Sequence, residues 1–171
     1  FFGVPTMLIA LLDSHEVSPV DYSSVKIAIS GGSMVAPELV RRVKNTVDCS
    51  FSTVYGQTET SPVLTQTFPD DSEEDICNTV GQPLPNKDIA ILDPQTSEVL
   101  PLDTIGEICS RGYCNMLCYN DNPEATKATI DENGWLHTGD LGSMDKRGYV
   151  KITGRLKEMI IRGGENLFPA E

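Results

Sequence analysis

The first 56 residues alternate between apolar stretches of strand character and amphipathic stretches of helical character. Val25–Ser30 is short and apolar and stops at a pair of glycines, which is typical of a buried strand. Pro37–Asn45 has apolar residues along one side and predicts a helix, and Phe51–Tyr55 predicts a second strand. Pro5–Leu12 predicts an earlier apolar helix. Because strand, helix and strand in this order favour parallel pairing, the sequence predicts an α/β fold with a parallel sheet.

From Gly81 onward the pattern changes to short strands separated by turn signals such as Asp93-Pro94. This pattern indicates a small antiparallel barrel or sandwich. We expect the boundary near Pro83–Pro85, with an α/β part in residues 1–84 and the antiparallel part in residues 85–153. The acidic stretch Asp70–Asp75 is expected to be a solvated loop. The expected strands are Asp88–Asp93, Gly106–Arg111, Trp135–His137 and Tyr149–Thr153.

The net charge of the 171 residues is -12, which argues against general binding of nucleic acids or anionic membranes, since both are polyanions. A few local donors and a metal ion can still hold ATP against this overall charge. No apolar run approaches the roughly 20 residues of a membrane span. The chain begins at Phe1 without Met and ends at Glu171 inside an apparent motif. We therefore expect a fragment of a longer protein.

The five cysteines form no CxxC pair, which favours free thiols in a reducing compartment. We expect a cytoplasmic protein, or a mitochondrial one if the source is eukaryotic. A zinc site built from Cys109, Cys114 and Cys118 is an alternative, but no His lies near them in sequence and their spacing fits no common zinc finger.

Two segments follow predicted strands, where open α/β sheets place ligands. In the first, Gly31 and Gly32 let the backbone approach a flat ligand, and the alternative is a simple tight turn. In the second, Tyr55 can stack on a base, Thr58 can donate to a phosphate or carboxylate oxygen, and Glu59 can hold Mg²⁺. The alternative for the second segment is an ordinary polar loop.

Two further segments supply an acid and a cation. Thr138-Gly139-Asp140 places a carboxylate after a glycine turn, and a carboxylate can accept both hydroxyls of a ribose. Gly154-Arg155 places a permanent cation after the last expected strand. Taken alone, the first is an ordinary turn and the second a surface Arg. We interpret His137 as a structural histidine rather than a general base.

Together these segments resemble the adenylate-forming enzymes, which include acyl-CoA and aryl-CoA synthetases, firefly luciferase and the adenylation domains of peptide synthetases. The resemblance runs in family order from end to end and is nearest to the medium-chain acyl-CoA ligases. It implies the fold of the N-terminal domain of these enzymes, namely the end of a parallel α/β sheet followed by a small antiparallel β-barrel. The matching segments are Ile29–Ser33, Tyr55–Glu59, Gly106–Ile108, Arg111–Tyr113, Gly134–Asp140, Gly154–Glu158 and Met159–Asn166.

The resemblance also implies residue roles and three small molecules: ATP, Mg²⁺ and CoA. Thr53 departs from the Asn that some members carry there, so an amide contact to adenine is not expected. Residues 154–171 would be a hinge and the start of a C-terminal domain. The implied roles are adenine and acyl-pocket borders for Gly31, Gly32, Tyr55 and Gly56, phosphate and Mg²⁺ for Thr58 and Glu59, the ribose for Asp140, ribose and phosphate for Arg155, the hinge for Lys157, and proximity to CoA for Gly163 and Gly164.

The activity implied is that of an ATP-dependent fatty acyl-CoA synthetase. Its phosphate loop would precede Phe1 and its catalytic Lys would follow Glu171, so we expect this segment alone to be inactive. Two alternatives are an adenylation domain of the peptide-synthetase type and a non-catalytic nucleotide-binding module. A downstream carrier sequence would identify the former, and ATP binding without pyrophosphate exchange the latter.

Overall fold

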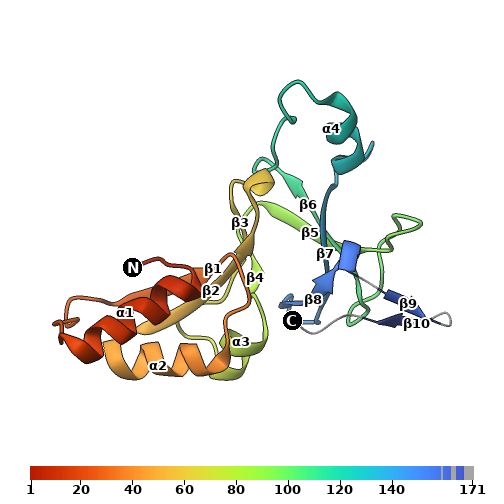
Figure 1. Cartoon of the computed structure of the whole chain (residues 1–171). Coiled ribbons are helices and arrows are strands. Elements are labelled where there is room, and N and C mark those ends of the chain that lie inside the picture. Colours follow the sequence, from red (N-terminus) through yellow and green to blue (C-terminus); the bar gives the residue numbers. More distant parts are fainter. Residues whose placement is uncertain (159, 163–164, 168–171) are drawn as a thin grey trace.

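The computed structural model describes residues 1–158, 160–162 and 165–167. Its first sheet has the strand order β1-β2-β3-β4 (Figure 1). β1 (Ile27–Gly31) and β2 (Ser50–Gly56) pair in parallel, as the sequence predicts. β3 (Val63–Gln66) and β4 (Gln82–Pro83), which the sequence analysis did not identify, add antiparallel pairs and make the sheet mixed.

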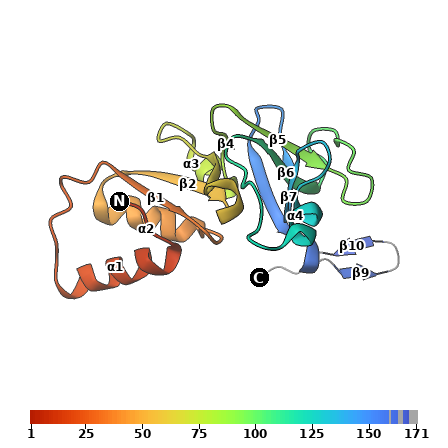
Figure 2. The same ribbon diagram turned by 90° about the horizontal axis from the view of Figure 1, so that it is seen from above.

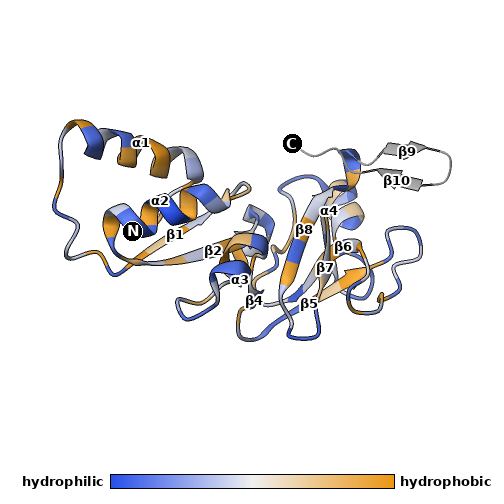
Figure 3. Ribbon diagram, turned by 90° about the horizontal axis from the view of Figure 1, so that it is seen from below, coloured by the Kyte–Doolittle hydropathy of each residue, from blue (hydrophilic) through white to orange (hydrophobic). Residues whose placement is uncertain are grey.

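Helices α1 (Pro5–Val17) and α2 (Pro37–Val47) pack together on the same side of β1 and β2 (Figure 1). Each helix has a proline in its first turn, where no backbone donor is lost. α2 turns an apolar stripe to the core and polar residues outward (Figure 3), and Asp48 in the left-handed conformation ends it. Its buried residues are Leu39, Val40, Val43 and Val47.

The acidic stretch is partly helical, so its interpretation as a solvated loop is wrong for residues 73–75. α3 (Glu73–Asn78) begins after Ser72, whose hydroxyl accepts a hydrogen bond from the Asp75 amide at 3.1 Å. The acidic residues of its first turn lie where the helix dipole favours negative charge. Ile76 anchors the helix in the core.

The second sheet is antiparallel, with strand order β5-β6-β7-β8, and lies beside the first (Figure 2). Its strands are β5 (Lys87–Leu92), β6 (Gly106–Gly112), β7 (Leu136–Met144) and β8 (Val150–Arg155). α4 (Pro123–Thr129) lies on the connection between β6 and β7. The predicted fold class, α/β followed by an antiparallel β region, is confirmed.

Strand β7 is longer than the expected Trp135–His137, because it continues through Gly139 and Asp140. Gly139 has a φ of 75°, so the residue that reads as a turn is an irregularity within a strand. After β8 come the short 3-10 helix η2 (Leu156–Glu158) and a hairpin of β9 (Ile160–Arg162) and β10 (Glu165–Leu167). Gly163 and Gly164 lie outside the described residues. None of the described helices has the length and hydropathy needed to cross a membrane.

Two hydrophobic cores each include a residue of β2. The first lies between α1, α2, α3 and the β1–β2 pair, and Phe51 is its largest fully buried side chain. The second core joins the two sheets, because Tyr55 of β2 and Leu64 of β3 belong to the same cluster as residues of the antiparallel sheet. Those residues are Ile91, Ile108 and Val150, together with Cys114 after β6.

Gly81 connects the two sheets, and we expect Gly81→Ala to destabilise the protein by about 2 kcal/mol or more. Its carbonyl accepts a hydrogen bond from the Val150 amide at 2.8 Å, and its φ is 80°. A Cβ at this position would lie 1.9 Å from the backbone carbonyl of Gln66. The free energy of unfolding, measured by urea denaturation, tests this expectation.

Gly148→Ala is the matched control. Gly148 has a similar φ of 83°, but a Cβ there would meet nothing within 4 Å. The control therefore measures the cost of backbone conformation alone. Equal losses of stability in the two variants would contradict the steric argument for Gly81.

Candidate active site

Three of the predicted site residues meet where the two sheets join. The Tyr55 hydroxyl donates a hydrogen bond to Asp140 Oδ2 at 2.9 Å, although the two residues are 85 positions apart. Arg155 Nε lies 3.1 Å from Asp140 Oδ1, and the two residues are register partners on β7 and β8. The fold thus places an aromatic hydroxyl, a carboxylate and a guanidinium in one cluster.

This cluster combines a covered carboxylate with an open cation. The Asp140 side chain is 11% exposed, whereas that of Arg155 is 70% exposed. Burial, and next the charge of Asp140, raise the pKa of the Tyr55 hydroxyl, so it remains a hydrogen-bond donor at neutral pH. A carboxylate has about four lone-pair sites, so Asp140 retains capacity to accept from a ligand diol.

The Tyr55 ring is buried, whereas stacking on a base requires an exposed ring face. Its residue exposure is only 8%, and its ring belongs to the second core. Its polar end contacts Asp140 rather than solvent. In this structure Tyr55 therefore positions the carboxylate.

A second layer of contacts fixes the backbone next to Asp140. The buried Glu107 accepts a hydrogen bond from the Gly139 amide through Oε1 at 2.9 Å. The Thr138 hydroxyl donates to the Ile108 carbonyl at 2.6 Å and accepts from the Asp140 amide at 3.1 Å. These contacts hold Gly139 in its positive-φ conformation. Glu107 lies in the matching segment Gly106–Ile108, but the resemblance implies no role for it.

His137 is hydrogen-bonded within the fold, in agreement with its interpretation as a structural histidine. Its Nδ1 lies 2.7 Å from Glu107 Oε2, and its Nε2 lies 3.8 Å from Asp131 Oδ2. Cys109 Sγ is 3.5 Å from the same Nδ1. The imidazole therefore bridges two carboxylates beside a buried thiol.

Glu59 lies in the 3-10 helix η1 (Thr58–Thr60), directly after the end of β2. Its Oε1 accepts a hydrogen bond from the Tyr119 hydroxyl at 2.8 Å, and its carbonyl accepts from the Met116 amide at 2.8 Å. The hydrogen bond to Glu59 is the main cause that raises the pKa of the Tyr119 hydroxyl. Thr58 is exposed at the start of η1. The segment after β6 thus holds Glu59 in place through Tyr119 and Met116.

Gly31 and Gly56 are required for steric reasons, whereas Gly32 is favoured by its backbone conformation. A Cβ on Gly31 would lie 2.3 Å from the Val54 carbonyl oxygen, and one on Gly56 would lie 1.8 Å from that of Pro62. At both positions the chain itself fills the space where a side chain would lie, which explains why each is a glycine. The approach of a flat ligand to the Gly31 backbone stays a prediction. Gly32 is exposed, with a φ of 82°, and fits the turn interpretation.

Thr53 and Lys157, two other positions singled out in the sequence, are not part of the Asp140 cluster. Thr53 is buried, and its hydroxyl donates to the Ile76 carbonyl at 3.0 Å. Thr53 is therefore committed to the core. Lys157 is exposed in η2, which directly follows Arg155 at the end of β8.

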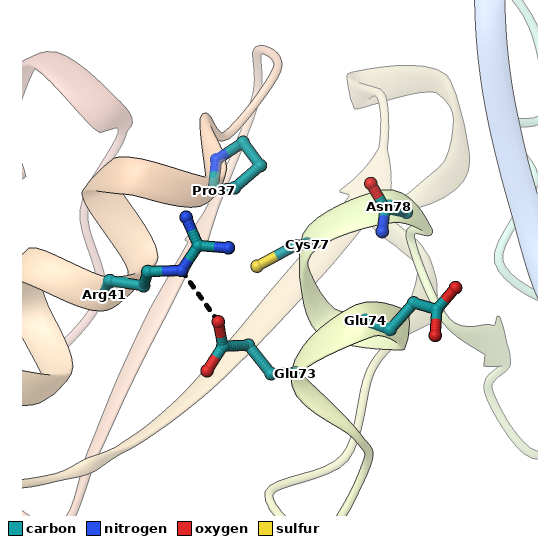
Figure 4. A pocket seen from close by; sticks show the side chains of 6 residues that line it. All are labelled: Pro37, Arg41, Glu73, Glu74, Cys77 and Asn78. Carbon is teal, nitrogen blue, oxygen red and sulfur yellow. Dashed lines mark hydrogen bonds and ion pairs between the residues drawn. The ribbon is translucent and has the colours of Figure 1, made fainter.

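A surface hollow of about 350 Å³ lies between α2 and α3 (Figure 4). The Arg41 guanidinium and the Glu73 carboxylate, 2.8 Å apart, lie across it. None of the predicted site residues lines this hollow, which therefore adds nothing to the Asp140 cluster. Its lining residues are Pro37, Arg41, Glu73, Glu74, Cys77 and Asn78.

Sequence comparison places residues 1–120 on the family model described as "AMP-binding enzyme". The chain is 39% identical over 171 residues to "Medium-chain acyl-CoA ligase ACSF2, mitochondrial" of Rattus norvegicus, covering 99% of this chain and 28% of the relative. It is 43% identical over 170 residues to "Putative acyl-CoA synthetase YngI" of Bacillus subtilis, covering 99% of this chain and 31% of that relative. The chain therefore spans under a third of the length of these relatives.

Solved structures agree with this match. ATP-bound MatB from Rhodopseudomonas palustris superposes with a TM-score of 0.85 and 33% identity, over 98% of this chain and 33% of that one. O-succinylbenzoate Coenzyme A Synthetase (MenE) from Bacillus subtilis, in complex with ATP and magnesium ion, gives 0.83 and 30%, over 98% and 34%. Because the family model matches residues 1–120 and these solved structures share the fold, the chain belongs to the family of AMP-binding enzymes.

Proposed function

We propose that the full-length protein is an ATP-dependent fatty acyl-CoA synthetase. A carboxylate would attack the α-phosphorus of ATP, giving acyl-AMP and pyrophosphate, and the thiolate of CoA would then displace AMP. The observation that carries the proposal for this chain is the Tyr55–Asp140–Arg155 cluster, where a covered carboxylate lies beside an exposed cation. The names of the relatives from rat and Bacillus support the substrate class.

In this proposal, Asp140 accepts the ribose hydroxyls through its remaining lone pairs. Arg155 interacts with the ribose and phosphate side of the nucleotide, where its exposed guanidinium can meet negative charge. Gly31, Gly32 and Gly56 border the adenine and acyl pocket as backbone. Because the Tyr55 hydroxyl and the Glu107 carboxylate fix Asp140 and its neighbour before ligand arrives, little reorganisation is needed on binding.

Thr58 and Glu59 would face the phosphates. Carboxylate oxygens are ligands that Mg²⁺ prefers, and the partly buried Glu59 is held at one oxygen by Tyr119, so these residues fit the ion. Bound Mg²⁺ would neutralise charge on the phosphate oxygens. Glu59 would hold the ion, and Thr58 would donate its hydroxyl to a phosphate or carboxylate oxygen.

The proposal extends to the chain's organisation. Residues 1–84 and 85–153 would be two subdomains of one domain, since the first sheet ends at Pro83 and the second begins at Lys87. Lys157 would be the hinge, and Gly163 and Gly164 would lie near CoA. We place the protein in the cytoplasm, or in the mitochondrion of a eukaryotic source, in keeping with the name of the rat relative.

The test is carboxylate-dependent exchange of pyrophosphate into ATP by the full-length protein, followed by thioester formation with CoA. Fatty acids of several lengths should support both reactions. Exchange without transfer to CoA would instead indicate an adenylation domain that loads a carrier. ATP binding without exchange for any carboxylate would indicate a non-catalytic nucleotide-binding module.

Tyr119→Phe should raise the Mg²⁺ concentration needed for half-maximal activity by about tenfold, because groups that orient a metal ligand contribute on this scale. The variant removes only the hydroxyl that donates to Glu59. Exchange should recover at saturating Mg²⁺. Tyr113→Phe, on the same segment but 75% exposed, is the control and should leave the requirement unchanged. A loss that excess Mg²⁺ does not restore would contradict the positioning role.

A further inference from the structure

Three side chains of different metal-binding types gather on one face of the antiparallel sheet. Glu107 and Cys109 are two positions apart on β6, so their side chains share a face, and His137 is the register partner of Cys109 on β7. One oxygen, one sulfur and one nitrogen from these residues all lie within 4.8 Å of one another. The pairing of two strands is thus enough to form the group.

The spacing is close to that of a tetrahedral zinc site. A thiolate sulfur and an imidazole nitrogen bound to one zinc ion are about 3.5 Å apart. Cys109 Sγ and His137 Nδ1 are already separated by 3.5 Å. Glu107 Oε2 is 2.7 Å from the same nitrogen, because it is hydrogen-bonded to it now. Oxygen and nitrogen ligands of one zinc ion lie roughly 0.6 Å farther apart than this, and a rotation of the Glu107 carboxylate can supply the difference.

The surroundings favour a cation with soft ligands. Cys109 is fully buried and the Glu107 side chain is 6% exposed, while His137 at 20% gives access from solvent. The carboxylates of Glu107 and Asp131, which lie on either side of the His137 ring, would attract a divalent ion.

We propose that Glu107, Cys109 and His137 bind a zinc-type divalent cation through one oxygen, one sulfur and one nitrogen. Binding would release the Cys109 thiol proton to solvent and move the imidazole proton of His137 from Nδ1 to Nε2, which faces Asp131. The hydrogen bond between Glu107 and His137 would be replaced by two metal bonds. A water would complete the coordination on the His137 side. Sulfur and nitrogen ligands select zinc over magnesium, so this site is distinct in chemistry from Glu59.

Of the three cysteines in the alternative zinc site, Cys109, Cys114 and Cys118, only Cys109 belongs to this cluster. Cys114 belongs to the second core and Cys118 is exposed, so neither joins Cys109. The missing histidine comes from a strand 28 residues away. Glu107 can bind a metal through Oε2 while Oε1 keeps its hydrogen bond to the Gly139 amide. Metal occupancy would therefore leave the support of Asp140 in place.

The test uses the full-length protein, stripped of metal and titrated with zinc against a chromophoric chelator. Wild-type protein should bind one more equivalent of zinc than Cys109→Ser, and this variant should lose at least about a hundredfold in affinity at the site. Co²⁺ in place of zinc should give a thiolate-to-cobalt charge-transfer band that Cys109→Ser lacks. Cys114→Ser, a buried cysteine outside the cluster, should keep both the equivalent and the band.

The proposal is overturned if Cys109→Ser binds zinc like the wild type, if Cys114→Ser loses as much, or if cobalt binds without the band. In those cases Glu107 and His137 form only a hydrogen bond that supports β7. Circular dichroism checks that Cys109→Ser is folded. His137→Gln is a second, partly exposed position that must also lose the zinc equivalent, so the result does not depend on one variant. None of these readouts requires enzymatic activity.

Discussion

Asp140→Asn in the full-length protein is expected to weaken the use of ATP by roughly ten- to a hundredfold. A hydrogen bond to a charged group contributes about 1.5–3 kcal/mol, which corresponds to that range. The structure adds a second reason. Both oxygens of Asp140 accept from donors, Tyr55 at one and Arg155 at the other. The amide group of Asn would place a donor against one of them. Kinetics of pyrophosphate exchange against ATP concentration measure the effect.

Asp88→Asn is the control for this prediction. Asp88 also pairs with an arginine, Arg111, at 3.1 Å, but its side chain is 62% exposed and lies at the far strand pair of the same sheet. An exposed ion pair contributes little, so this variant should behave as wild type. Unchanged ATP affinity and adenylation rate in Asp140→Asn would refute the ribose assignment.

Lys157→Pro is expected to separate the two half-reactions. A hinge residue absorbs a large change in backbone angles between two domain orientations. Lys157 occupies the middle of η2, directly after the strand that carries Arg155. Proline fixes its own φ and drives Leu156 away from the helical region, so one orientation should be trapped. We expect acyl-AMP formation, followed by pyrophosphate exchange, to survive better than thioester formation.

Lys157→Ala tests whether the backbone or the charge matters. It removes the ammonium group but leaves the backbone free, so it should slow thioester formation far less than Lys157→Pro. If proline slows both half-reactions equally, or neither, the hinge assignment is wrong. Lys157 would then be a solvated surface charge.

The elements predicted correctly are those whose signal is local. α2 shows its apolar stripe and its N-terminal proline within 11 residues. β1 is a short apolar run, β2 contains aromatic and β-branched residues, and each strand ends at a glycine. β3 was missed because it is only four residues long and follows a turn in which Ser61 has a φ of 54°. α3 was missed because its first turn is acidic, and that composition suggested a loop.

In the candidate site too, the features that depend on short motifs could be predicted, and those that depend on contacts between distant strands could not. Asp140 and Arg155 could be named from short motifs, whereas the contact of Asp140 with Tyr55 requires two sheets to meet. The extent of β7 could not be read either, because the glycine that suggests a turn is held in the strand by Glu107. The grouping of Cys109 with His137 depends on the β6–β7 register, which no spacing in the sequence reveals.

The core shared by the two sheets has a consequence for cooperativity. Tyr55 and Leu64 complete a cluster whose other members come from the antiparallel sheet and the segment after β6, so the second core forms only when the two sheets are docked. The carboxylate proposed to hold the ribose gains its Tyr55 partner only when this core has closed. A nucleotide at Asp140 would accordingly bind only when the two sheets are docked. Its binding would therefore stabilise both sheets together against unfolding.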